Sequence, residues 1–577
     1  MKKYRSWGLT AAAVFLALYV TGILFPMMFY LNDDVTMRNI LSGTYTGVPN
    51  GHAVYMKYPL TGLISMLYRL FGQVPWFSLI MVGFFWLSVT MVLGHMAHIA
   101  GQIGKAGISL MACVALLCVA LFLPQAVYLH YTVVAAMLGG CGLFLVVMGG
   151  GKKSILLFVL CYCVRSQVFF LLLPFLAVIL LWLLWEKRSM QQLVMPALLM
   201  VCILGCMVWN GLMYRSEDWQ QFDAYNESRT QLYDYHDVLP YDEYAGQYER
   251  AGIGEWEYSI MEQYALSLEK GVDAGKLQAA VDIYAAKLGT ERNPSEYFRF
   301  CMIEYYYHTR YTDKPYNYIL ICAYLLVVVL LLWKRRWVQL LLVCCTAAGR
   351  SLIWFYLIWQ GRFPERIYIS LYLLEIMALV GMLCAILMEK SRRNGSVKAE
   401  NNLENNGKKW KSTAMVGMCG LASILLIGTG YVQMNETLDK IVAQEEAQKE
   451  WDVLTEYCAG NEDCFYLLDV KSMVSYAGRV WETASGKANY LLAGGWMSRT
   501  PLLKERLAAM GAVDGGELLV KGEAEGTRIF YIAKSNRDMN WLSEYLSSRF
   551  GEVTVEKTDS IMQGERELFC VYGVTYP

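Results

Sequence analysis

The sequence predicts an α-helical polytopic membrane protein with about eleven transmembrane helices and a small α/β domain at its C-terminus. Of its 577 residues, 56% are hydrophobic and only 17% are charged, which is too apolar for a soluble globular protein of this length. Apolar runs close to the length that a helix needs to cross a bilayer recur along most of the chain. After the last of them, short strands alternate with helices.

The apolar segments are long enough to span a membrane, or nearly so, at residues 7–29, 76–93, 107–123, 131–148, 190–213, 316–333, 340–359, 367–388 and 413–431. The segment 154–185 is too long for one upright helix and carries Arg165 and Gln167 in its middle. We therefore predict two shorter helices that meet near Arg165. The segment 7–29 lacks a small-residue cleavage site, so we interpret it as a retained first helix.

Basic residues predict the orientation, because they gather on the cytoplasmic side of membrane proteins. With the split at Arg165, every basic cluster falls on the same side as the N-terminus; these clusters are Lys2, Lys3 and Arg5, Lys152 and Lys153, Lys187 and Arg188, 334–336, Lys390 with Arg392 and Arg393, and Lys408, Lys409 and Lys411. The N-terminus is thus predicted to be cytoplasmic and the C-terminal domain extracytoplasmic, in the cell membrane. The outer segments are 30–58, 124–130, 214–315 and 360–366.

Two domains follow from this count. Residues 1–432 form the transmembrane domain with its outer loops 30–58 and 214–315, and the polar stretch 391–411 is a flexible cytoplasmic linker within it. The loop 214–315 is acidic and rich in tyrosine, with helix-like stretches at 255–268 and 275–288. It is either a solvated cap or an aromatic wall of a substrate groove.

Residues 433–577 form the extracytoplasmic domain. Strands are predicted at 464–470 and 528–533, helices at 501–510 and 540–550, and a closing hairpin at 552–557 and 567–572. Cys458 and Cys464 flank a short polar turn and form either a local disulfide or two free thiols. The chain has 50 basic and 50 acidic side chains, so no charge excess points to nucleic acid.

The most informative residues are Asp33 and Asp34, directly after the first apolar helix. A carboxylate there can take a proton from an acceptor hydroxyl. The pair can also bind a divalent cation such as Mg or Mn, and no other cofactor is indicated. The alternative is structural, with Asn32, Asp33 or Asp34 capping a helix at 35–41. The same loop supplies His52, Tyr55 and Lys57 as candidates for a substrate cavity.

Arg362 and Arg366 form a second candidate site in the predicted outer turn. An arginine binds phosphate or pyrophosphate through paired hydrogen bonds, whereas the alternative for Arg366 is to reach the lipid headgroups. A third candidate is Arg165 with Gln167.

A charge inside an apolar segment needs a partner or a polar cavity, and Arg350 within 340–359 raises the same question. His130, in the turn 124–130, can face the same cavity. Motifs of the P-loop, HExxH and GxSxG types are absent from the sequence.

A first helix, an outer loop that opens with an acidic pair, a many-helix body and a soluble C-terminal domain together resemble the GT-C superfamily of membrane glycosyltransferases. The resemblance covers the topology of about the first 430 residues, and Asp33-Asp34 matches the family's first-loop acidic motif. It implies a sugar taken from a polyprenyl-phosphate or polyprenyl-pyrophosphate carrier on the outer face of the bilayer, with an Asp as base or metal ligand.

The resemblance further implies that Arg362, Arg366 or Arg165 binds the carrier phosphate. The acceptor would be a glycan, lipid or protein of the cell envelope, and the transfer would invert the anomeric centre. Two other hypotheses stay open. The first is a transporter or flippase of an anionic lipid-linked or envelope substrate, for which intramembrane Arg165 and Arg350 are suited. The second is a non-catalytic assembly protein that binds through its C-terminal tail.

Overall fold

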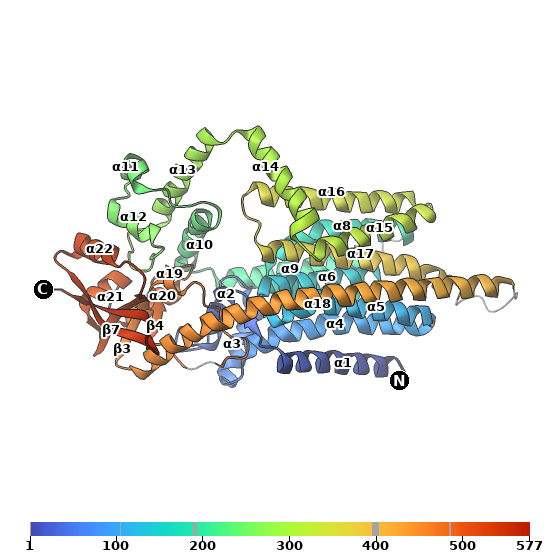
Figure 1. Cartoon of the computed structure of the whole chain (residues 1–577), viewed down its shortest axis with the longest axis horizontal. Helices are drawn as coiled ribbons and strands as arrows, with labels where there is room; N and C mark the ends of the chain where they lie inside the picture. The colour runs from blue at the N-terminus through green and yellow to red at the C-terminus, as the bar shows by residue number, and fades with distance from the viewer. Residues whose placement is uncertain are drawn as a thin grey trace.

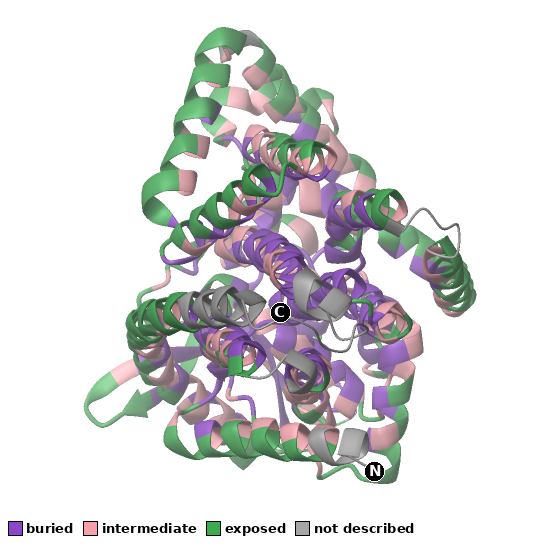
Figure 2. Cartoon of the chain, turned by 90° about the vertical axis from the view of Figure 1, so that its right-hand side faces the viewer, coloured by how far each residue is buried: buried purple, intermediate pink, exposed green. Residues whose placement is uncertain are grey.

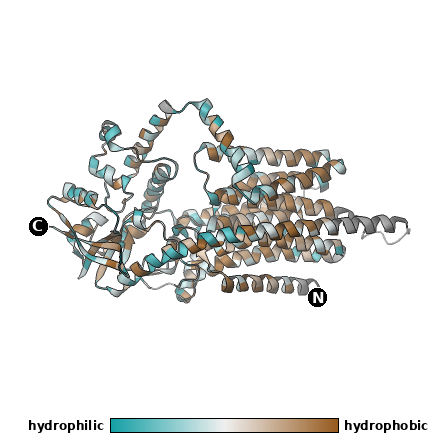
Figure 3. Cartoon of the chain, in the orientation of Figure 1, coloured by the Kyte–Doolittle hydropathy of each residue, from teal (hydrophilic) through white to brown (hydrophobic). Residues whose placement is uncertain are grey.

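The computed structural model describes residues 2–103, 105–187, 193–394, 403–483, 486–524 and 526–576. A bundle of nearly parallel apolar helices occupies one half of the molecule, and a polar half made of the C-terminal domain and a helical cap occupies the other (Figures 1 and 3). The predicted class, a multi-pass helical protein with a small α/β domain, is confirmed.

The bundle contains eleven helices within the described residues: α1 (Lys2–Leu24), α4 (Trp76–Ile103), α5 (Lys105–Val127), α6 (Tyr131–Val147), α7 (Gly151–Val164), α8 (Ser166–Lys187), α9 (Val194–Met213), α15 (Tyr316–Trp333), α16 (Trp337–Trp359), α17 (Glu365–Asn394) and α18 (Leu403–Gly460). Among the described residues, nine helices are long and apolar enough to cross a membrane. The exceptions are α6, with 17 residues, and α7, with 14 residues. At 1.5 Å per residue α7 is only about 21 Å long, shorter than the hydrocarbon core of a bilayer.

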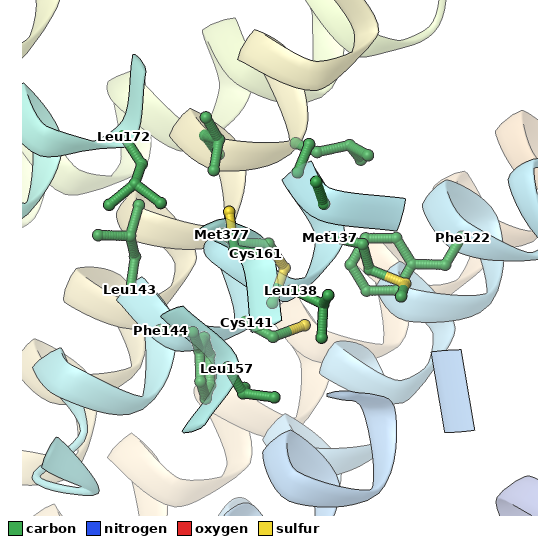
Figure 4. Packing of buried hydrophobic residues seen from close by; sticks show 14 of the residues in the cluster. Phe122, Met137, Leu138, Cys141, Leu143, Phe144, Leu157, Cys161, Leu172 and Met377 are labelled. Carbon is green, nitrogen blue, oxygen red and sulfur yellow. The ribbon is translucent and has the colours of Figure 1, made fainter. Parts of the chain in front are cut away.

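Helix α6 is the centre of the bundle, and all of its residues are buried. Buried residues gather in the middle of the bundle and exposed ones on its outer faces (Figure 2). Small residues let its neighbours approach closely: a Cβ atom at Gly140 would lie 2.9 Å from the carbonyl oxygen of Leu373 in α17, and one at Gly142 would lie 2.6 Å from the ring of Phe158 in α7. Apolar side chains of α6 and α7 pack together in the same core (Figure 4). Dispersion and close contact, which need small interfacial residues, thus hold the bundle together.

The predicted break in 154–185 is confirmed, since α7 ends at Val164 and α8 begins at Ser166. Arg165 has an extended backbone between them, with φ −153°. Arg165 therefore lies at the predicted junction of two helices and not inside one continuous helix. It lies where two helices end, on the side of the bundle that faces the C-terminal domain, because the amide of Lys57 in the first loop donates to the Cys163 carbonyl at 2.8 Å.

Two short helices follow α1 and cover this end of the bundle. They are α2 (Asn32–Ser42) and α3 (Tyr58–Leu70). Helix α1 ends at Leu24, five residues before the predicted end at 29, and the chain then runs as the short strand β1 (Met28–Phe29). Helix α3 packs against α2, α7 and α9.

The segment 214–315 is folded and helical. It contains α10 (Glu217–Thr230), a π-helical turn at Gln231–Tyr235, α11 (Tyr241–Arg250), α12 (Glu255–Glu262), α13 (Ala274–Glu291) and α14 (Pro294–Tyr307). The stretch predicted at 255–268 stops at Glu262, and Tyr264 then adopts a left-handed backbone with φ 57°. Buried side chains of this helical cap, such as Ile260 and Leu266, share one core with Leu467 and Leu518 of the C-terminal domain. The cap and the C-terminal domain therefore form a continuous body.

The C-terminal domain holds a six-stranded sheet of order β4-β3-β6-β8-β7, with β5 paired to β6. The strands are β3 (Cys464–Leu468), β4 (Tyr490–Leu492), β5 (Glu523–Ala524), β6 (Thr527–Lys534), β7 (Thr554–Gln563) and β8 (Arg566–Thr575), and the helices are α19 (Val470–Met473), α20 (Pro501–Ala509), α21 (Gly515–Lys521) and α22 (Asn540–Phe550). Strand β3 is parallel to β4 and β6, whereas β6, β8 and β7 are antiparallel. The predicted strands and helices are present, and the hairpin is longer than predicted. Cys458 and Cys464 are free thiols.

Helix α18 connects the two halves as one 58-residue rod (Figure 1). It begins inside the stretch predicted to be a linker at 391–411 and continues through the predicted domain boundary at 432–433. Residues 391–394 belong to α17 and 403–411 to α18, whereas 395–402 lie outside the described residues.

Candidate active site

The acidic pair is held in place from both sides. Before it, β1 pairs in parallel with β2 (Tyr128–Leu129), the segment that leads into α6. On the other side, the amide of Phe29 donates to the Gly478 carbonyl at 3.1 Å and the amide of Val480 donates to the Met27 carbonyl at 2.9 Å. The chain that precedes Asp33 is thus a strand between the bundle and the C-terminal domain.

Asp33 and Asp34 lie in the first turn of α2, where the helix dipole favours negative charge. The N-cap is Leu31, and no side chain caps this helix. The alternative that Asp33 or Asp34 caps a helix starting at residue 35 is therefore wrong, because the helix starts at Asn32 and includes both residues.

The two carboxylates differ in their surroundings. Asp34 is fully buried, and its Oδ1 accepts a hydrogen bond from the Tyr131 amide at 3.1 Å, which satisfies an amide at the start of α6. Burial raises the pKa of Asp34 well above its usual range. Asp33 is partly exposed. Asp34 is thus engaged with the backbone of a neighbouring helix, whereas Asp33 is open to a substrate.

Three arginines from distant parts of the chain surround Asp33. Burial raises the pKa of Asp33, and the charges of Arg366, Arg165 and Arg229 lower it. These arginines come from the first turn of α17, the α7–α8 junction and α10. The three cations offset part of the cost of burying this carboxylate, and the pKa of Asp33 still stays above its usual value.

Arg165 has surroundings that suit the binding of an anion. Its guanidinium carbon lies 5.3 Å from the ring centre of Tyr55 and 5.2 Å from that of Tyr131. Its buried Nη1 has no hydrogen-bond partner among the described residues. Burial and then the charge of Arg165 lower the pKa of Lys57, whereas Asp223 raises it. Two neighbouring cations, one of them with a lowered pKa, form a site that an anionic ligand would stabilise.

The predicted arginine pair is divided between two roles. Arg362 forms an ion pair with Asp234 at 2.6 Å and lies over the ring of Tyr235 at 5.0 Å, so its charge is already compensated. Arg366, four residues later, is the one whose charge acts on Asp33 and on His130. Arg366, and not Arg362, is therefore the arginine of this turn whose charge reaches the acidic pair.

Two predicted cavity residues are not brought to Asp33. The Nδ1 of His52 contacts Asn50 Oδ1 at 2.8 Å and its Nε2 contacts the Met213 carbonyl at 3.1 Å. Its ring stacks on Trp219 with centroids 5.0 Å apart. Both ring nitrogens of His52 thus contact oxygen atoms of the protein, and neither is left for a substrate. Gln167 is exposed in the first turn of α8 and contacts Ser166.

His130 does belong to the site. It is 2% exposed, and its Nδ1 accepts a hydrogen bond from the Thr132 amide at 2.9 Å. Burial, followed by the charges of Arg366 and Arg165, lowers its pKa well below the usual range. The ring is therefore neutral and carries its proton on Nε2.

Arg229 and Tyr264 also belong to the site, although neither was predicted from the sequence. Arg229 is 3% exposed. It donates a hydrogen bond from Nη1 to the Tyr264 hydroxyl at 2.7 Å and another from Nε to Asn226 Oδ1 at 2.9 Å. In the sequence Arg229 is one charge in a polar helix. The only available signal was its four-residue spacing from Tyr225, which puts both residues on the same, inward face of α10.

Arg350 is part of a buried ion pair and not of this site. Its Nε lies 3.2 Å from Glu375 Oε2, and its Nη1 donates to the Tyr305 hydroxyl at 3.1 Å. The Tyr324 hydroxyl donates to the other oxygen of Glu375 at 2.5 Å. Of the two alternatives for Arg350, the paired one holds, and the pair links α16 to α17.

A metal at the acidic pair would need more ligands than the pair itself. Within the described residues, no group of three or more His, Cys, Asp and Glu side chains is placed to hold a metal ion. Asp34 already gives one oxygen to the Tyr131 amide, and its Oδ2 is buried without a partner among the described residues. A Mg or Mn ion at Asp33 and Asp34 stays a prediction.

No protein-family model matches the chain, and no curated protein matches it. A solved structure to which it is similar in overall arrangement is that of ArnT from Cupriavidus metallidurans bound to undecaprenyl phosphate. The alignment covers 98% of this chain and 97% of the other, with 10% sequence identity and a TM-score of 0.48. The roles assigned below come from the geometry of this chain alone.

Proposed function

We propose that the protein is a membrane glycosyltransferase that moves a sugar from a polyprenyl-phosphate carrier to an acceptor hydroxyl. The observation that carries the proposal is the placement of Arg165 near Asp33, with Lys57 near Arg165. The buried Nη1 of Arg165 has no partner among the described residues, and the charge of Arg165 acts on the partly exposed carboxylate of Asp33. This site lies at one end of a bundle whose helices are long and apolar enough to span a bilayer.

Each part of this arrangement has a task in such a transfer. Arg165, Lys57 and Arg366 hold the carrier phosphate and stabilise the charge that it gains as the leaving group. The acceptor oxygen forms a bond to the anomeric carbon, the bond from that carbon to the phosphate oxygen breaks, and its electron pair leaves with the phosphate. Asp33 takes the acceptor proton, and this single displacement inverts the anomeric centre.

A lipid carrier explains why the site lies at the end of the bundle. The prenyl chain cannot leave the membrane, so the phosphate must be met at its boundary. Helix α7 is shorter than the hydrocarbon core, which brings Arg165 closer to the apolar layer than the ends of the longer helices. We further propose that this end is extracytoplasmic and that the acceptor is a glycan, lipid or protein of the cell envelope.

A transporter or flippase is less well supported by the same geometry. Its case rested on two free intramembrane arginines, and Arg350 is paired with Glu375 while Arg165 lies at a helix junction. Arg165 and Lys57 could still bind an anionic lipid for transport, so an assay must separate transport from transfer.

The test uses purified full-length protein in nanodiscs. We expect undecaprenyl phosphate to bind and Arg165→Gln to weaken this binding by tenfold or more, because one charge-assisted phosphate contact is lost. Arg69→Gln is the matched control, since Arg69 donates to the Pro49 carbonyl at 3.0 Å and lies outside the cluster. Equal affinity in all three proteins contradicts the phosphate site. Transfer of radiolabelled sugar from undecaprenyl-phosphate sugars to envelope extract then distinguishes an enzyme from a flippase.

A further inference from the structure

A second cavity lies beside the phosphate cluster. It has a volume of about 230 Å³ and is enclosed by the start of α6, by α5, α15 and α17, and by α18 where that helix leaves the bundle. His130 and Arg366 line it, and both also face the charges around Asp33. The cavity is therefore next to the proposed reaction centre and not part of the Arg165–Lys57 pair.

Three deeply buried polar atoms line this cavity without a hydrogen-bond partner among the described residues. They are His130 Nε2, Asp313 Oδ2 and Gln433 Oε1, on side chains that are 2%, 2% and 7% exposed. Burying a polar atom without a partner is unfavourable, so each calls for a ligand group or ordered water.

The contacts of these three side chains fix what they can offer. His130 accepts at Nδ1, so Nε2 is a donor. Asp313 contacts His308 Nδ1 through Oδ1 at 2.8 Å, which leaves Oδ2 as an acceptor. Gln433 donates from its amide nitrogen to the Tyr316 hydroxyl at 2.8 Å, which leaves Oε1 as a second acceptor.

The remaining wall of the cavity carries charges of both signs. Lys440 lies 2.8 Å from Glu365 Oε1, and the Tyr30 hydroxyl donates to Glu365 Oε2 at 3.4 Å. The lining carries three cations, Lys314, Arg366 and Lys440, against three carboxylates, Asp313, Glu365 and Glu436, so it has no excess positive charge for a phosphate. A polar wall also gives an apolar chain no advantage. Groups that both donate and accept hydrogen bonds suit this wall, and hydroxyls do both.

We propose that this cavity binds a single monosaccharide ring, so that His130, Asp313 and Gln433 select the sugar; this rests on the proposed function. The cavity volume of about 230 Å³ corresponds to about eight waters at roughly 30 Å³ each, which is enough for one sugar ring. The ring belongs to the carrier-linked donor or to the acceptor, and the two sources share this chemistry.

The experiment compares bare undecaprenyl phosphate with a panel of undecaprenyl-phosphate hexoses and pentoses, and with methyl glycosides of the same sugars. Asp313→Asn and Gln433→Met remove one unpartnered acceptor each. Gln444→Met is the control on the same helix, because Gln444 also bonds a tyrosine, Tyr128, but does not line the cavity. Size-exclusion profiles and melting temperatures in nanodiscs verify folding of each variant.

If the ring is the donor's, one carrier-linked sugar binds at least tenfold more tightly than the bare carrier. Both variants then lose this advantage while their affinity for the bare carrier changes less than twofold. If the ring is the acceptor's, a methyl glycoside binds in the presence of saturating carrier-linked sugar, and the variants remove that binding.

An equal loss for bare and sugar-linked carrier, or no sugar that binds better in either arm, overturns the proposal. Failure of the proposed function is a separate result: either the protein does not bind bare undecaprenyl phosphate, or Arg165→Gln does not weaken that binding.

Discussion

Replacing each aspartate of the pair by asparagine tests the central assignment. Asn keeps the size of Asp and removes its charge and its capacity as a base. Asp33 is partly exposed and surrounded by arginines, so Asp33→Asn should leave folding intact and lower the transfer rate by about a hundredfold or more, the usual scale for loss of a general base.

Replacement of Asp34 should have a smaller effect on the transfer rate, because this side chain bonds a backbone amide. Its Oδ1 accepts from the Tyr131 amide at 3.1 Å, and the amide oxygen of Asn can keep that bond. Asp34→Asn should therefore retain most of the rate. Asp34→Ala leaves a buried amide without an acceptor, which costs roughly 1–3 kcal/mol of stability.

The assay measures single-turnover transfer from the undecaprenyl-phosphate sugar that the protein accepts, at saturating donor, together with the melting temperature in nanodiscs. Donor affinity of each variant is determined first, so that a lost chemical step is not mistaken for lost binding. If Asp33→Asn transfers at the wild-type rate, Asp33 is not the base. If Asp34→Asn loses a hundredfold while Asp33→Asn does not, the roles of the two residues are exchanged.

Three further predictions concern other parts of the molecule. Burial raises the pKa of Asp33 and the charge of Arg366 lowers it, so activity should fall as the pH drops through the raised pKa. Arg366→Gln should raise this pKa further and move the acidic limb of the kcat/KM profile to higher pH. If the limb does not move, the electrostatic contact between Arg366 and Asp33 is contradicted. Glu375→Ala leaves the buried charge of Arg350 unpaired and should cost roughly 3–5 kcal/mol in detergent unfolding, a loss that a double variant with two apolar residues should largely reverse. An impermeant maleimide added to intact cells should label a cysteine at Glu565, in the hairpin of the C-terminal domain, and not one placed in 395–402; the reverse pattern would invert the predicted topology.

Elements with a strong local signal were predictable. Uninterrupted apolar length predicted the bundle helices, and the charge at Arg165 inside an apolar run predicted the break between α7 and α8. The strands β3 and β6 follow from short apolar runs bounded by polar turns. The ends of α1, α4 and α18 were wrong by several residues or more, because apolar composition does not record where a helix continues into polar surroundings.

The candidate site was only partly predictable, because its residues meet through tertiary contacts. The position of Asp33 and Asp34 after the first helix was informative, and Arg165 and His130 were recognised as polar groups next to apolar segments. Arg229 was missed because a buried arginine in a polar helix has the same sequence pattern as an exposed one. His52 was included because of its loop, although its ring packs on Trp219.

The position of Asp33 depends on the C-terminal domain as well as on the bundle. The loop at Gly478–Val480 bonds the strand that precedes the acidic pair, and the Arg479 carbonyl accepts from Arg38 of α2 at 3.1 Å. Arg479 in turn reaches Glu445 at 2.7 Å and Asp452 at 2.9 Å, both on α18. Since α18 runs from the bundle into the C-terminal sheet, a single arginine links the rod, the domain and the helix that carries the acidic pair. Isolated surface ion pairs stabilise little, but a network that closes such a loop restricts motion of α2. The C-terminal domain is therefore part of what holds the proposed base in place, and a chain cut after the bundle should lose transfer even where it still binds the carrier phosphate.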